Sequence, residues 1–204
     1  TSQFENTTLI SQTTKRPNIT FCYSKTLTSD PGINTIKNVS DEIFVTGSSR
    51  RSVNLWNTTN WTIIKSYTET NDVFSIEYVL KNIIAYVLFI SNEINLMDIT
   101  NMNITKKLIG HPGNINSMIY SPNNYLISTC DQKYIFIWNT TTGLALKNFT
   151  SVSIIKSMIF LKNGDLVTAI ASSITIWNTT SWSVKASATK HTGNINVLAL
   201  WTNG

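Results

Sequence analysis

Short apolar runs separated by turn residues make up most of this 204-residue chain. No long run keeps the i, i+3, i+4, i+7 spacing of an amphipathic helix. Apolar residues instead alternate with others, as in a strand, and four runs share one pattern on one face: Val53/Leu55, Ile94/Leu96, Ile135/Ile137 and Ile174/Ile176. A large side chain lies on the opposite face of each run. The pattern predicts an all-β chain of short strands that are apolar on both faces.

The same runs reveal an internal repeat. They end in the related sequences VNLWNTTN, INLMDITN, IFIWNTTT and ITIWNTTS. Their equivalent residues are separated by 41, 41 and 39 positions, and they are Trp56, Met97, Trp138 and Trp177. HPGNIN at 111 and HTGNIN at 191 lie 80 residues apart, which fits the same period. The chain is therefore predicted to consist of units of about 40 residues.

Each unit is predicted to hold four antiparallel strands. In the third unit we expect strands at 115–120, 125–130, 134–138 and 144–149. In the fourth, Asn163-Gly164 predicts a two-residue type I′ hairpin turn. The longest apolar run, from Ile83 to Ile90, predicts one buried strand. It is far shorter than the roughly 20 residues of a membrane-spanning helix, so no membrane span is expected.

A single four-stranded sheet that is apolar on both faces is not stable in water, so neighbouring units must stack. Radial stacking gives a β-propeller. A solenoid is the alternative geometry, but units of four strands favour propeller blades. The predicted blades are 28–69, 70–110, 111–150 and 151–190, with an incomplete blade at 191–204. Residues 18–27 are expected to form the outer strand of a preceding blade, and the polar segment 1–17 to be poorly ordered. We expect the chain to be a piece of a larger propeller.

These residues resemble the WD-repeat family, whose unit opens with Gly-His, closes its third strand with Trp-Asp and folds as a propeller blade. The resemblance covers residues 28–204. Gly110-His111 followed by Trp138 has the family spacing, and His191 keeps the histidine without the glycine. Met97-Asp98 keeps the aspartate without the tryptophan.

The resemblance also implies a hydrogen-bonded network in each blade, made by the histidine, a strand Ser or Thr, the tryptophan and an aspartate before the third strand. The corresponding turns are SRR at 49, ISN at 90, CDQ at 130 and ASS at 171. Only the turn holding Asp131 can supply the carboxylate. Most blades are therefore expected to lack the complete network. The structural repeat positions are Trp56, Met97, Asp98, Gly110, His111, Asp131, Trp138, Trp177 and His191.

Composition and charge argue against several kinds of chemistry. The net charge is +5, but the 16 Lys and Arg residues are scattered, so we expect no nucleic-acid binding. Cys22 and Cys130 are too few for a disulfide framework and are expected to be free thiols. His111 and His191 occupy the structural position of the repeat. No catalytic or nucleotide-binding motif is present, so we predict no enzyme activity, metal site or cofactor.

Nine N-x-S/T sequons raise the alternative of an extracellular glycoprotein. With 24 Asn and 51 Ser or Thr, chance alone gives about six such sequons. Three more come from one repeated motif, at Asn57, Asn139 and Asn178. A cytoplasmic location is therefore the expectation, with an extracellular one as the alternative.

The resemblance implies a non-enzymatic scaffold that binds proteins or peptides through its loops. The alternative is the sensor or regulatory region of a larger enzyme or receptor. The candidate surface is the face formed by the turns before the first strands, near 30–34, 70–72, 111–114, 151–153 and 191–194. Trp61 and Trp182 could be exposed binding anchors, but packing between blades is the favoured prediction for them and for the matching Phe21 and Met102.

Overall fold

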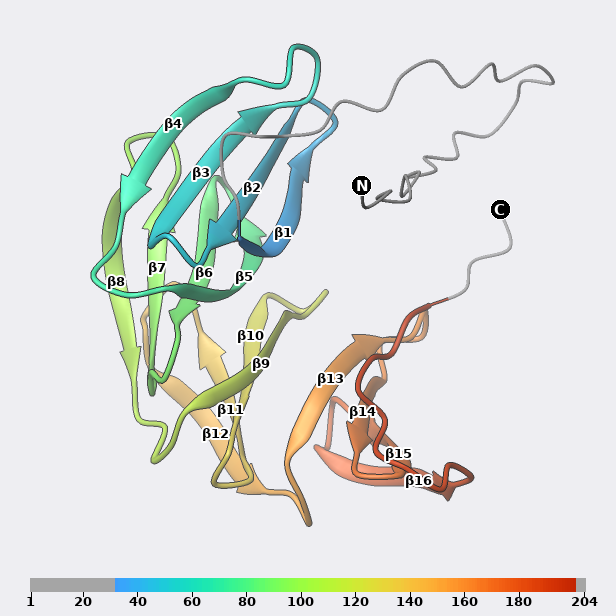
Figure 1. The fold of residues 1–204 in the computed structure, drawn as a ribbon. Helices are drawn as coiled ribbons and strands as arrows, with labels where there is room; N and C mark the ends of the chain where they lie inside the picture. The colour runs from blue at the N-terminus through green and yellow to red at the C-terminus, as the bar shows by residue number, and fades with distance from the viewer. Residues whose placement is uncertain (1–31, 201–204) are drawn as a thin grey trace, which may run out of the picture.

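The computed structural model describes residues 32–200 as four sheets of four antiparallel strands each, with no helix in this range (Figure 1). Blade 1 holds β1 (Ile33–Ser40), β2 (Ile43–Ser48), β3 (Ser52–Asn57) and β4 (Ile63–Thr68). Blade 2 holds β5 (Val73–Leu80), β6 (Ile83–Leu88), β7 (Glu93–Asp98) and β8 (Asn103–Ile109). Blade 3 holds β9 (Ile115–Tyr120), β10 (Tyr125–Cys130), β11 (Tyr134–Asn139) and β12 (Ala145–Thr150). Blade 4 holds β13 (Ile155–Phe160), β14 (Leu166–Ile170), β15 (Ser173–Asn178) and β16 (Ser183–Thr189).

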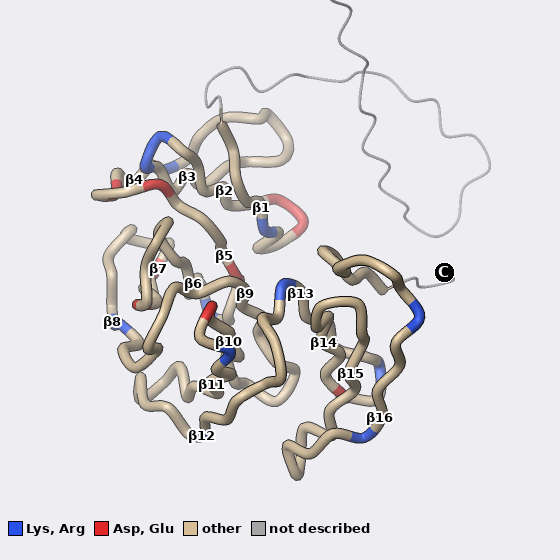
Figure 2. Tube along the Cα trace, turned by 60° about the horizontal axis from the view of Figure 1, so that its bottom comes forward, with Lys and Arg blue, Asp and Glu red and all other residues tan. Residues whose placement is uncertain are grey.

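The blades stand around a common centre, and the first strand of each is innermost (Figure 2). These first strands contact one another in chain order, β1 with β5, β5 with β9 and β9 with β13. Within each sheet the strands follow their order in the sequence, from the inner strand to the outer one. The predicted all-β propeller of four-stranded antiparallel blades is therefore confirmed. The segments 1–17 and 18–27 lie outside the described residues.

Three apolar cores lie between successive blades. Val53 and Leu55 of blade 1 pack with Tyr86 and Met97 of blade 2. The next two cores repeat this arrangement: Ile94 and Leu96 pack with Phe136 and Trp138, and Ile135 and Ile137 pack with Trp177. Where two described blades meet, the aliphatic face of one third strand packs against the Trp or Met face of the next. Blades 2 and 3 bury both faces in this way.

Polar links along the inner strands reinforce the stacking. The Thr35 hydroxyl accepts a hydrogen bond from the Ile76 amide at 3.3 Å. The Ser157 hydroxyl likewise accepts one from the Leu198 amide at 3.0 Å, again 41 residues ahead. Residues 191–200 pair with no strand in the structure, yet this bond places Leu198 beside β13 as the periodicity requires.

One ion pair crosses between the inner strands of blades 1 and 2. The Lys37 ammonium lies 2.8 Å from a carboxylate oxygen of the buried Glu77. Burial raises the pKa of Glu77, and the Lys37 charge opposes that rise. Because Lys37 compensates the buried charge, the pair holds the two blades in register and leaves Glu77 in a structural role.

The predicted hairpin turn in blade 4 is wrong. Asn163-Gly164 does not form a type I′ turn, because only Gly164 has a positive φ, of 83°. The Gly164 amide bonds to the Leu161 carbonyl, and the Leu161 amide to the Asp165 carbonyl, as in a longer loop ending in a left-handed residue. The turn with two positive φ values lies instead at Lys81-Asn82, between β5 and β6.

The run from Ile83 to Ile90 is not one buried strand either. β6 ends at Leu88, and Phe89 and Ile90 are exposed in the turn that follows. Ile90 has a φ of 56°, in the left-handed region that a strand cannot continue through. Turn geometry therefore overrides the apolar character of these two residues.

The predicted packing of the residues five positions after the repeat Trp is confirmed for two of three. Met102 is buried in the core between blades 1 and 2, and Trp182 packs against the core between blades 3 and 4. Trp61 is 42% exposed and touches only Phe44 among aromatic rings. No described blade precedes blade 1 to cover it. Phe21 lies outside the described residues.

We expect Trp138→Ala to lower the free energy of unfolding by about 3 to 5 kcal/mol, because the indole is 1% exposed and fills the core between blades 2 and 3. Trp61→Ala is the matched control and should cost about 1 kcal/mol or less. Urea unfolding followed by circular dichroism measures both. Equal losses in the two variants would contradict the stacked arrangement.

Candidate interaction face

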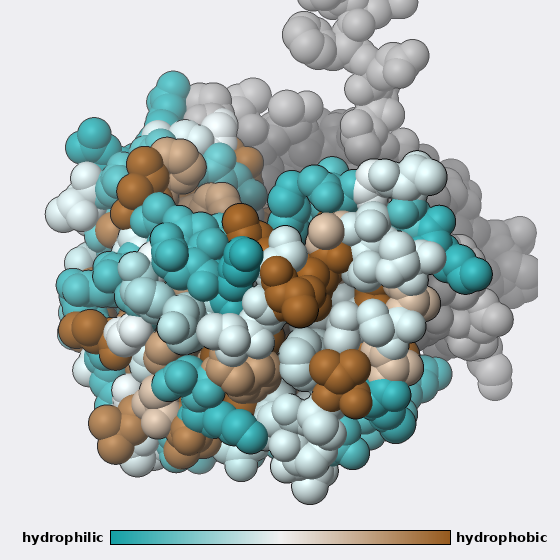
Figure 3. Space-filling view, turned by 90° about the horizontal axis from the view of Figure 1, so that it is seen from below, coloured by the Kyte–Doolittle hydropathy of each residue, from teal (hydrophilic) through white to brown (hydrophobic). Residues whose placement is uncertain are grey.

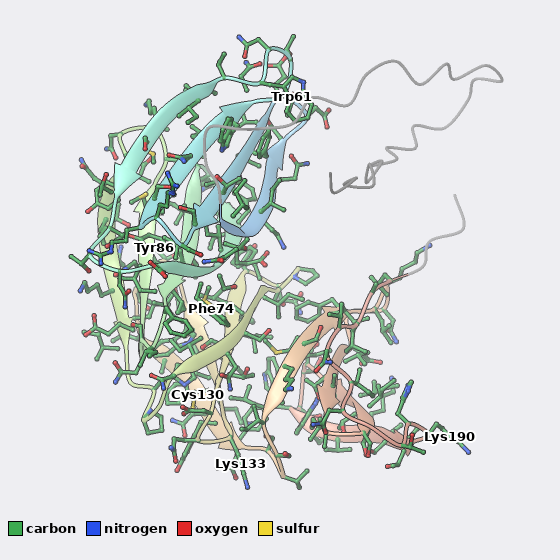
Figure 4. The ribbon with its side chains drawn as sticks, in the orientation of Figure 1. Trp61, Phe74, Tyr86, Cys130, Lys133 and Lys190 are labelled. Atoms are coloured by element: carbon green, nitrogen blue, oxygen red, sulfur yellow. The ribbon has the colours of Figure 1, made fainter. Side chains whose placement is uncertain are left out.

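The two ends of the propeller carry different sets of turns. We call the loop face the end that holds the connections between blades and the turns between second and third strands. We call the turn face the opposite end, with the remaining hairpin turns. In Figure 4, Trp61 lies at the top, on the turn face, and Lys133 lies at the bottom, on the loop face. The predicted binding surface corresponds to the loop face.

The turn face repeats one structural device in every blade. Asn139 Oδ1 accepts hydrogen bonds from the amides of Thr141 and Thr142, at 2.9 and 3.0 Å. Asn57 and Asn178 do the same for the amides two and three residues on. Asp98 accepts from the amide and hydroxyl of Thr100, which lowers the pKa of its carboxyl. Turn formation explains the three sequons at this position.

Blade 3 holds a buried polar chain behind the loop face. The Ser128 hydroxyl lies 2.6 Å from His111 Nε2 and accepts a hydrogen bond from Trp138 Nε1 at 2.8 Å. Burial lowers the pKa of His111 from 6.5 to about 4, so the imidazole is neutral at pH 7. Gly110 lies against the same indole, where a Cβ would come within 3.3 Å of Trp138. The chain therefore fixes the loop before β9 to the body of the blade.

Asp131 does not join this chain. Its Oδ2 accepts a hydrogen bond from Asn114 Nδ2 at 3.1 Å, and its Oδ1 and His111 Nδ1 are both buried without a partner. Asp131 begins the turn after β10, and its amide also donates to the Asn114 carbonyl at 2.9 Å. His191 is exposed, and no hydrogen bond joins it to another described residue.

The tryptophans of blades 1 and 4 make the shorter version of this chain. Trp56 Nε1 donates to Thr46 Oγ1, and Trp177 Nε1 donates to Thr168 Oγ1, each at 2.9 Å. Both bonds are buried, so each satisfies an indole N–H inside the stack of blades.

The loop face differs from blade to blade and exposes apolar side chains. Between blades 1 and 2 it contains a hollow of about 360 Å³, lined by Asn34, Ser49, Asp72, Phe74 and Phe89. Further exposed apolar residues on this face are Ile90, Ile109 and Val152. From the side on which Lys133 lies, separate brown groups interrupt a mostly white and teal surface (Figure 3). The face thus combines apolar anchors with a polar surround.

Residues suited to other functions are sparse within 32–200. This range contains no group of three or more His, Cys, Asp or Glu residues that could hold a metal ion. Its free cysteine, Cys130, is buried in the core. Nor does it contain a helix long and apolar enough to cross a membrane.

Comparison with known proteins identifies the repeat. The family model "WD domain, G-beta repeat" matches residues 102–139. A chain of the structure described as "Crystal Structure of Mitotic Checkpoint Complex" matches with a TM-score of 0.67 and 13% identity, over 76% of this chain and 50% of that chain. Residues 102–139 therefore match a WD repeat, and the structural likeness shows a β-propeller fold. The chain spans about half the length of that structural relative.

The remaining comparisons do not specify a function. No curated protein matches the sequence. Because 1445 chains of solved structures match, the likeness shows the fold and does not single out one partner. A WD-repeat propeller supports a role as a protein-interaction scaffold in general terms.

Blade 2 departs from the WD-repeat pattern by a paired exchange. Met97 stands where the other blades have Trp, and Tyr86 stands at the position of Thr46, Ser128 and Thr168. The smaller residue on the third strand is thus matched by a larger one on the second, and both are fully buried. The Tyr86 hydroxyl donates to Glu69, and burial with this neighbouring carboxylate raises the pKa of Tyr86.

Sequence reasoning missed the aromatic part of the hollow. It assigned Phe89 to a buried strand and gave no role to Phe74. The signal available in the sequence was the comparison of equivalent positions in the repeats, which the strand registers define. Phe74 stands at the position of Asn34 in blade 1, and Phe89 at the position of Ser49. An aromatic pair where a neighbouring repeat has a polar pair marks these positions as special to blade 2.

We expect the free energy of unfolding to decrease as the pH is lowered, because His111 is neutral in the folded chain. The unfolded chain protonates this residue near pH 6.5 and the folded chain near pH 4, so the unfolded state binds more protons between these values. The contribution of His111 to the free energy of unfolding is fully present above pH 6.5, and the free energy of unfolding decreases by about 3 kcal/mol as the pH falls to 4. Denaturant unfolding at pH 7 and pH 4 should give a smaller drop for His111→Gln. His191→Gln, the control, should behave like wild type; an equal drop in all three proteins would disprove the assignment.

We expect Asn139→Ala to destabilise the chain by about 1 kcal/mol, because two backbone amides of the turn lose their acceptor. Asn139→Asp keeps that oxygen and should leave stability nearly unchanged, because Asp98 accepts the equivalent hydrogen bond in blade 2. Thermal unfolding compares the two variants. A loss of the same size in both would refute the turn role and indicate that the amide nitrogen matters instead.

Proposed function

We propose that this chain is a non-enzymatic scaffold that binds a protein or peptide partner through its loop face. The observation that carries the proposal is the contrast between the two ends of the propeller. The turn face repeats the same Asn or Asp turn in every blade. The loop face changes sequence at each blade and exposes apolar side chains beside a hollow. Residues that differ between repeats are free to specify a partner, whereas repeated ones serve the fold.

The composition of the loop face supports a protein partner. Isolated apolar anchors surrounded by polar groups are typical of protein interfaces, which are on the whole no more apolar than other surface. Exposed Phe and Ile residues provide such anchors, while Asn, Ser and charged residues surround them. Charges are few and mixed along the described chain, as Figure 2 shows, so the face offers no continuous basic track for nucleic acid.

A site-specific photo-crosslinking experiment tests this function. The crosslinker p-benzoylphenylalanine replaces Val152, which is 85% exposed on the loop face, or Leu144, which is 67% exposed on the turn face. We expect discrete crosslinked partners at position 152 in cells, reduced by excess unmodified protein and by Ile109→Ser on the same face. Position 144 should give only background. Equal yields at both positions, or none at 152, would contradict the proposal.

A further inference from the structure

The hollow between blades 1 and 2 has a mixed chemical character. Blade 1 contributes Asn34 and Ser49, blade 2 contributes Phe74 and Phe89, and the connection between them contributes Asp72. Its volume of about 360 Å³ falls in the lower range of ligand sites. It therefore suits one side chain of a partner better than a whole folded element.

Each wall of the hollow is held in place by contacts of its own. Ser49 Oγ donates to Asn34 Oδ1 at 2.9 Å, and Asn34 Nδ2 donates to the Val73 carbonyl at 3.0 Å. The Phe89 amide donates to the Asp72 carbonyl at 2.8 Å. These bonds tie the turn after β6 to the connection before β5, so the walls are set before any partner arrives.

The aromatic wall leaves ring surface accessible. The Phe74 and Phe89 centroids lie 6.4 Å apart, with 53° between the ring planes. Both residues are exposed. Figure 4 labels Phe74 on the inner strand β5, next to blade 1. An exposed ring face carries partial negative charge and attracts a cation placed over it.

The carboxylate of Asp72 is uncompensated. Asp72 is half-buried, and its carboxylate forms no hydrogen bond or ion pair with another residue of the described range. Arg50 and Arg51 follow Ser49 in the same turn, but neither pairs with Asp72. The hollow thus joins two ring faces to one free negative charge.

We propose that this hollow binds an arginine side chain of the partner, which deepens the scaffold function and rests on it. The guanidinium stacks on the rings of Phe74 and Phe89 and bonds to Asp72, while its methylene stem lies along the apolar wall. Arginine fits better than lysine, because its planar cation stacks on aromatic rings and is more weakly hydrated. An anionic side chain would be repelled by Asp72. An aliphatic one would desolvate that carboxylate without giving it a partner.

Titration with defined peptides tests the proposal. The probes are acetyl-Gly-Arg-Gly-amide and the same peptide with citrulline, a neutral isostere of arginine. We expect the arginine peptide to shift the NMR amide signals of Asp72 and Phe89 with a Kd of about 1 mM. The citrulline peptide should bind at least about fivefold more weakly, because it lacks the charge.

Variants of the full chain assign the binding to the hollow. Asp72→Asn should weaken arginine-peptide binding about fivefold, and Phe89→Leu about two- to fivefold. Asp41→Asn, an exposed aspartate in the turn between β1 and β2 on the turn face, is the matched control and should leave binding unchanged. Phe89 and Asp41 are exposed and the half-buried Asp72 carboxylate has no partner, so thermal unfolding should stay near wild type.

The outcomes separate this proposal from the wider function. Equal binding of the two peptides, unaltered binding by Asp72→Asn, or no shift at Asp72 and Phe89 up to about 10 mM peptide would overturn the arginine site. Preferential shifts from an aliphatic or acidic peptide would overturn it too. Crosslinking at position 152 would persist in each case if the loop face still binds its partner elsewhere.

Discussion

Burial of apolar sheet faces between successive blades is the constraint on which the rest of this structure depends. A four-stranded sheet with Val53 and Leu55 on one side and Trp56 on the other cannot stand alone in water. Each blade therefore covers its neighbour, and three cores result from the same pairing of positions. Since the contacts join residues about 40 positions apart, the sequence period and the spatial period coincide. The contacts that stack the blades come mainly from the strands rather than from the loops.

The polar network inside the blades is less essential than this packing. Only blade 3 brings a His to its Ser and Trp, through His111. Blades 1 and 4 keep the Trp to Thr bond alone, and blade 2 replaces it with Met97 and Tyr86. All four sheets nevertheless have the same order and pairing. Stacking tolerates these exchanges because it requires filled volume and satisfied donors rather than one set of residues.

Residues that repeat in every blade lie on the turn face, and residues that vary between blades lie on the loop face. The turn face uses one Asn or Asp turn four times, because each hairpin between third and fourth strands closes in the same way. The loop face has no such requirement, so blade 2 can present Phe74 and Phe89 where blade 1 has Asn34 and Ser49. A small change at equivalent positions thereby lines the hollow between blades 1 and 2 with two aromatic rings.

The sequence by itself determined the all-β class, the repeat and which residues of each third strand share a face, because these follow from periodicity within the chain. Only the tertiary structure decided that Phe89 and Ile90 leave β6, that Asp131 bonds to Asn114, and that Trp61 stays exposed while Met102 is buried. Each of these outcomes depends on which group stands opposite across a turn or between two blades. Turn geometry and contacts between blades are not specified by the local apolar pattern.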